Sequence, residues 1–78
     1  MSKVHEGYLI DLGVLVKEMA VSVREEVKQA GSTTDDYLLG RKMALYEVIS
    51  LMRHQAWAFG LPMDDVGLGD FDPDRDLL

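Results

Sequence analysis

Apolar residues recur between residues 4 and 30 with the spacing of an α-helix. They fall on one broad side, whereas Glu18, Glu25 and Gln29 fall opposite, as in an amphipathic helix. Gly13 lies beside the apolar side, which predicts either a close contact with another helix or a local break, and Gly31 is expected to end the helix. The apolar side comprises Tyr8, Leu9, Leu12, Leu15, Val16, Met19, Ala20, Val23, Val27 and Ala30.

A second helical pattern runs from residue 34 to residue 59. Any of Ser32, Thr33 and Thr34 provides a side-chain oxygen that can cap its first turn. Gly60 and Pro62 are expected to end it. Its apolar residues at intervals of seven are Leu38, Leu45, Met52 and Phe59, with Val48, Ile49 and Ala56 between them.

The connector between the two patterns is short, which makes the helices antiparallel neighbours. If the turn centres near residues 32 and 33, the numbers of facing residues sum to about 65. This register brings Val27 near Leu38 and Val16 near Ile49, so apolar residues face each other. We therefore predict an all-α fold in which residues 1–62 form an antiparallel two-helix hairpin.

The C-terminal segment, residues 63–78, has a different pattern and is called the tail below. It holds six aspartates and one arginine, a net charge of −5, whereas residues 1–63 hold eight acidic and seven basic residues. Alternation of acidic and apolar residues is typical of a segment that becomes ordered on contact. We expect a mostly irregular tail, extended or ordered on contact. Its predicted docking residues are Val66, Leu68, Phe71, Leu77 and Leu78.

A chain of 78 residues without cysteine makes one small domain whose own core is marginal. With 47% hydrophobic and 28% charged residues, it is too apolar for wholesale disorder. It has neither an apolar run of the ~20 residues that a membrane span needs nor a secretion signal, so we expect a cytoplasmic protein. The small core predicts that a second chain completes the structure.

Further apolar residues lie outside the predicted contact between the helices, where they indicate an interface. These residues form a stripe, called the interface stripe below, that could pack against a second copy, against a different protein, or beneath the folded-back tail. We favour the second copy, which predicts a homodimeric four-helix bundle. The predicted interface residues are Leu39, Met43, Tyr46, Arg53 and Trp57 on the second helix, with Ile10, Val14 and Val21 on the first.

The candidates for catalysis and metal binding are few. Glu47, Ser50 and His54 share one side of a helix, but nucleophilic catalysis also needs an oxyanion hole and a pocket that excludes water. His5 and His54 lie near helix ends that the hairpin brings together, with Glu6 close by. However, the sequence has neither a cysteine nor a Glu-x-x-His pair to complete a zinc site. We expect a solvated polar patch in the first case and no metal in the second.

The tail aspartates at positions 70, 72, 74 and 76 alternate like the first ligands of a calcium loop. However, Arg75 occupies the position where such a loop requires glycine, Pro73 stiffens it, and the chain ends before a twelfth-position glutamate. We therefore expect no calcium site, and the sequence predicts no catalytic residue, metal or cofactor.

No motif identifies a molecular function. The sequence favours a non-enzymatic protein-interaction module that self-associates and binds another protein as an adaptor, chaperone or inhibitor. The alternative is a small nucleic-acid-associated regulator that uses a row of Lys17, Arg24 and Lys28 on the first helix. The net charge of −6 argues against nucleic acid, because neutralisation of phosphates supplies most of that affinity.

Overall fold

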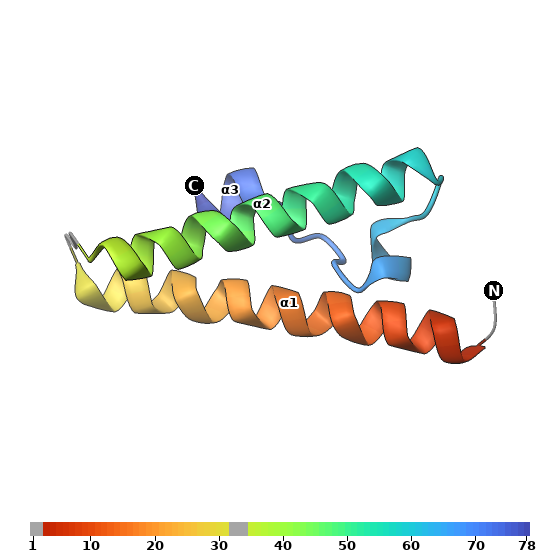
Figure 1. Cartoon of the computed structure of the whole chain (residues 1–78), viewed down its shortest axis with the longest axis horizontal. Coiled ribbons are helices and arrows are strands. Elements are labelled where there is room, and N and C mark those ends of the chain that lie inside the picture. Colours follow the sequence, from red (N-terminus) through yellow and green to blue (C-terminus); the bar gives the residue numbers. More distant parts are fainter. Residues whose placement is uncertain (1–2, 32–34) are drawn as a thin grey trace.

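The computed structural model describes residues 3–31 and 35–78 and contains two long helices that lie side by side (Figure 1). Helix α1 spans Lys3–Ala30 and helix α2 spans Asp36–Ala58. The two helices are antiparallel and form the hairpin that the apolar periodicity predicted. The described residues form helices, turns and loops and contain no strand.

The ends of the helices show which residues stop and start them. Gly31 and Gly60 have φ angles of 67° and 71°, the left-handed conformation expected after the last turn. Asp35 caps α2, because its side chain accepts hydrogen bonds from the backbone N–H groups of Tyr37 at 3.0 Å and Leu38 at 3.2 Å. The cap is therefore Asp35 rather than Ser32, Thr33 or Thr34, which lie outside the described residues.

The contact between α1 and α2 is tightest toward the connector. Ala20 and Val23 of α1 and Ile49 of α2 are fully buried there, and Leu45 is nearly so. The Arg41 guanidinium donates a 2.9 Å hydrogen bond to Glu26 Oε2 across the two helices. Residues 26 and 41 thus face each other, which agrees with the predicted register.

The helices diverge toward the opposite end of the hairpin, and the tail enters the space between them (Figure 1). The tail begins with a 3₁₀ helix, η1 (Met63–Val66), that contacts both α1 and α2. It continues to a short helix, α3 (Pro73–Leu77), that packs on α2. The expectation of a mostly irregular tail is therefore wrong over these two segments, because apolar tail residues are anchored in the hairpin. In addition, the side chain of Asp72 caps α3 by accepting a hydrogen bond from the backbone N–H of Asp74.

The tail approaches α1 so closely that two backbones touch. A Cβ atom on Gly13 would lie 1.6 Å from the carbonyl oxygen of Val66, and one on Gly67 would lie 2.1 Å from the carbonyl oxygen of Ile10. Any side chain at either position would collide with main chain, so both glycines are required. The close contact predicted at Gly13 is therefore with the tail and not with the second helix, and α1 continues through Gly13 without a break.

Candidate interaction surfaces

Apolar anchors hold the tail on one side of the hairpin. Val66, Leu68, Phe71 and Leu77 are buried and belong to the same core as Ile49 of α2. The fifth predicted docking residue, Leu78, is exposed. The tail thus adds four large side chains to a core that the two helices alone leave small.

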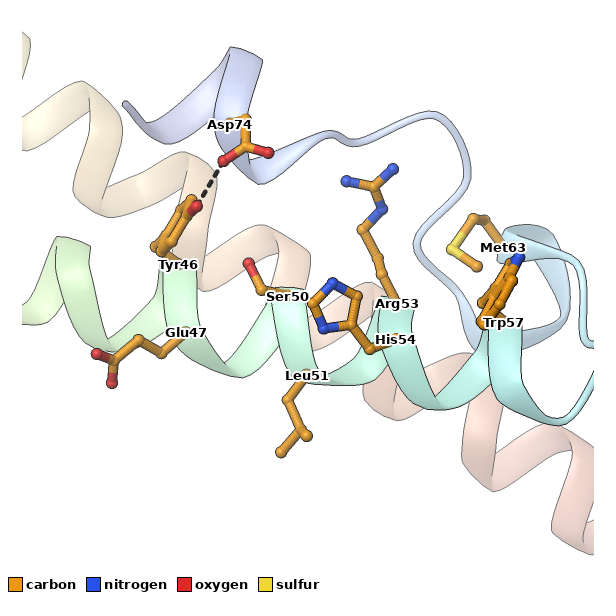
Figure 2. A pocket seen from close by; sticks show the side chains of 9 residues that line it. All are labelled: Tyr46, Glu47, Ser50, Leu51, Arg53, His54, Trp57, Met63 and Asp74. Atoms are coloured by element: carbon orange, nitrogen blue, oxygen red, sulfur yellow. Dashed lines mark hydrogen bonds between the residues drawn. The ribbon is translucent and has the colours of Figure 1, made fainter.

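Polar contacts fix the far part of the tail to α2. The hydroxyl of Tyr46 donates a hydrogen bond to Asp74 Oδ1 (Figure 2), and the Arg53 guanidinium donates one to Asp72 Oδ1 at 3.2 Å. The hydrogen bond to Asp74 raises the pKa of Tyr46. Tyr46 and Arg53 therefore contact the tail of their own chain, which is one of the three arrangements that the sequence left open.

Within the tail, Arg75 and Asp76 form a local ion pair. Arg75 Nη2 lies 2.8 Å from Asp76 Oδ2, and a second nitrogen of Arg75 also donates to Asp76. Together with the hydrogen bond from the backbone N–H of Asp72, this pair lowers the pKa of Asp76 to about 2. The carboxylate of Asp76 thus remains charged well into the acid range and helps to hold the loop before α3 closed.

The other residues of the predicted interface stripe lie in mixed surroundings. On α2, Leu39 and Met43 are partly exposed, and Trp57 is 82% exposed. On α1, Val14 and Val21 are half-buried and Ile10 is 40% exposed. The tail therefore covers only part of this stripe, and Trp57 is the most exposed residue of the stripe.

A larger exposed apolar surface lies on the opposite side of the hairpin. Successive residues of a helix are about 100° apart, which shows where the exposed apolar residues lie. On α1 they lie on the flank turned away from Gly13, which contacts the tail. On α2 they lie on the flank turned away from Tyr46 and Arg53, which also contact the tail. We call this surface the apolar face. It consists of Val4, Tyr8, Leu12, Leu15 and Met19 from α1, Val48 and Leu51 from α2, and Phe59, which directly follows α2; their exposed fractions run from 39% to 79%.

Several of these residues were predicted to lie between the two helices. The predicted register places Met19 near Leu45, and Tyr8, Leu12 and Leu15 share the apolar side of the first helix with Met19. Each of the four is 39% exposed or more, so the expectation that this whole side packs on the second helix is wrong. The same correction applies to Phe59, which is 76% exposed. The signal for a second surface was present in the sequence, since the apolar side of the first helix is wider than one neighbouring helix can cover.

An apolar groove opens beside the apolar face where the helices diverge. It encloses about 270 Å³, and its floor includes Val66 of the tail. Leu51 and Phe59 belong to both the groove and the apolar face. The groove is lined by Leu9, Leu51, Met52, Gln55, Ala56, Phe59, Leu61 and Val66.

A second, more polar groove runs along α2 beside the tail (Figure 2), and all three residues considered for catalysis line it. Ser50 and His54 extend into it between Tyr46 and Trp57, whereas the carboxylate of Glu47 points away from His54. The three groups therefore do not converge on a common point, as an acid–base relay to a nucleophile requires.

Neither the metal candidates nor the basic row forms a recognisable site. In residues 3–31 and 35–78, no three side chains of His, Cys, Asp or Glu are arranged to hold a metal ion. The basic row runs beside acidic groups: Arg24 Nε and Lys28 Nζ lie 3.6 and 3.9 Å from Glu25 Oε1, and Arg24 also interacts electrostatically with Asp76 of the tail. These acidic neighbours reduce the positive potential that the row offers to nucleic acid.

Two further findings bear on function. Within the described part of the chain, neither long helix has a stretch apolar enough to cross a bilayer. No protein-family model, curated protein or solved structure matches the chain. The surfaces of the molecule are therefore the guide to its function.

Proposed function

We propose that the protein is a non-enzymatic interaction module that self-associates through the apolar face. Two hairpins would pack these faces together and form a homodimeric four-helix bundle, with each tail on an outer side. The observation that carries the proposal is the contrast between the two sides of one hairpin. One side is partly covered by the tail, whereas the other exposes eight large apolar side chains to solvent.

The size of the apolar face approaches that of a stable interface. The eight side chains are 39–79% exposed and together present an apolar surface on the order of several hundred Å². A specific interface of standard size buries about 800 Å² on each partner. Monomeric proteins rarely leave so extensive an apolar surface in contact with water.

The distribution of charge favours a second copy as the partner. The net charge of −5 in the tail lies on the side away from the apolar face, and the remainder of the chain is nearly neutral. In a face-to-face dimer the two tails would be separated by two helix layers, roughly 20 Å. That distance exceeds the Debye length of ~8 Å at physiological ionic strength, so repulsion between the tails would be small.

The Glu26–Arg41 ion pair also suits a symmetric contact. It lies toward the connector, where the side chains of Arg41 and Glu26 are 32% and 48% exposed, and each neutralises the other at 2.9 Å. A second copy approaching the apolar face would therefore meet no unpaired charge from this pair. In a dimer with twofold symmetry the same surface serves both partners, so one apolar face suffices for closed assembly.

Sedimentation velocity of charged variants tests the proposal. Leu51→Glu places a charge in the centre of the proposed contact but in solvent in the monomer, because Leu51 is 60% exposed. We expect this variant to sediment as a folded monomer under conditions where the wild type is a dimer, because burial of an unpaired charge is costly.

The matched control is Trp57→Glu, which introduces the same charge at an exposed apolar residue outside the apolar face. We expect this variant to remain a dimer. Dissociation by Trp57→Glu with a persistent Leu51→Glu dimer would instead locate the interface on the predicted stripe, and a wild-type monomer at every concentration would rule out self-association.

A further inference from the structure

We propose that the docked tail and the second copy stabilise each other, so that the tail controls self-association without lying in the interface itself. This inference rests on the proposed dimer and concerns its regulation. It follows from the position of η1, which contacts both helices at the end where they diverge. The tail therefore sets the relative placement of the two halves of the apolar face.

Val66 forms the direct connection between the two surfaces. On one side, its carbonyl group and the neighbouring Gly67 lie against the backbone of α1 at Gly13. On the other side, Val66 lines the apolar groove together with Leu51 and Phe59, which belong to the apolar face. Loss of the tail would remove the floor of the groove and the segment that separates the helices there.

Hydrogen bonds within the tail favour its docking and release as one unit. Backbone hydrogen bonds within it join Leu68 N to Met63 O and Phe71 N to Leu68 O, each at 3.1 Å. Its connection to α2 passes through Gly60 and Pro62, where no regular helix constrains the chain. Release would break the contacts at Gly13, Tyr46 and Arg53 without requiring either long helix to unwind.

Tail docking and dimerisation are coupled by thermodynamic linkage, so each must favour the other equally. If the second copy binds the hairpin more tightly when the tail is docked, dimerisation must favour docking by the same factor. A protein whose tail is released, by a competing partner or by a modification, would then dissociate. The acidic tail would act as a switch for assembly from the outer side of the bundle.

The first test follows hydrogen exchange of the tail in the wild-type protein. We expect the amides of Leu68 and Phe71 to exchange at least tenfold more slowly above the dimer dissociation constant than below it. Exchange that is independent of concentration while the dimer forms would overturn the linkage and leave self-association intact. Absence of any dimer would overturn both, so the two failures are distinguishable.

The second test measures the reciprocal effect with Gly13→Ala, whose new Cβ would meet the main chain of Val66 and Gly67 in the tail. We expect at least tenfold weaker dimerisation in sedimentation equilibrium, together with faster exchange at Leu68. Gly40→Ala is the matched control, because a Cβ at Gly40 meets nothing within 4 Å, and its dimerisation should equal that of the wild type.

A dimer of Gly13→Ala that is as tight as the wild type, or tighter, while its tail exchanges freely would contradict the proposal. If Gly13→Ala loses the circular-dichroism signal of the hairpin, Tyr46→Phe replaces it, because this variant removes the hydroxyl that donates to Asp74 and keeps the aromatic ring. We then expect a two- to fivefold weaker dimer, and an unchanged dissociation constant with faster tail exchange would be the contradicting result.

Discussion

Replacement of Gly13 by alanine should destabilise the protein, although glycine-to-alanine changes inside helices normally stabilise them. The intrinsic preference of alanine for the helix favours the variant by about 1 kcal/mol. Against this gain, the new Cβ would lie 1.6 Å from the carbonyl oxygen of Val66 and 2.9 Å from the Cα of Gly67. Because both neighbours are main-chain atoms, no side-chain rotation relieves the collision, and the tail must move.

The magnitude follows from what the movement disrupts. Overpacking in a protein core costs about 1–3 kcal/mol, and displacement of the tail also exposes part of four buried side chains worth ~2 kcal/mol each when fully buried. The conformational entropy that the tail regains on release offsets much of the second contribution. After subtraction of the helix preference, we expect a net loss of about 2 kcal/mol, or a Tm lower by roughly 8–16 °C for a domain of this size.

Thermal denaturation followed by circular dichroism at one fixed protein concentration measures this effect, because the stability of a self-associating protein depends on concentration. Gly40→Ala provides the comparison, since its Cβ meets nothing within 4 Å and should raise stability by about 1 kcal/mol. If Gly13→Ala proved as stable as Gly40→Ala, the contact between the tail and α1 would not exist as described.

Three other changes have defined outcomes. Asp35→Ala should lower the free energy of unfolding by about 1 kcal/mol in urea denaturation, because the N–H groups of Tyr37 and Leu38 lose their acceptor. The low pKa of Asp76, about 2 against an ordinary 3.8, means that its ion pair stabilises the fold above about pH 4 and is lost as the pH falls toward 2. Asp76→Asn should therefore be less stable than the wild type at pH 6 and approach it at pH 2, whereas an equal difference at both pH values would contradict that origin. Leu15→Glu should, like Leu51→Glu, yield a monomer in sedimentation velocity with unchanged helical content, because Leu15 is 57% exposed on the apolar face.

The hairpin could be predicted because its determinants are local. Apolar spacing defines each helix, glycine and proline mark the ends, and a short connector fixes the antiparallel arrangement. The bounds of α2 differ from the prediction by one or two residues, since Asp35 caps the helix and Phe59 lies beyond it. Such shifts are expected where several neighbouring residues can each serve as a cap.

The place of the tail could not be predicted, because it depends on contacts between distant segments. The paired glycines at positions 13 and 67 each have an ordinary local explanation, and only the structure shows that they face each other. The misassigned residues on α1 have a different cause. They lie on a flank of α1 that is turned away from the buried side holding Gly13, Ala20 and Val23, so α2 does not cover them.

The molar mass of the wild-type protein in solution tests the proposed self-association most directly. Light scattering coupled to size-exclusion chromatography, over a range of loading concentrations, should give twice the 8.8 kDa of one chain as concentration rises. A folded, fully helical species of 8.8 kDa at every concentration would show that the eight exposed side chains do not serve a second copy.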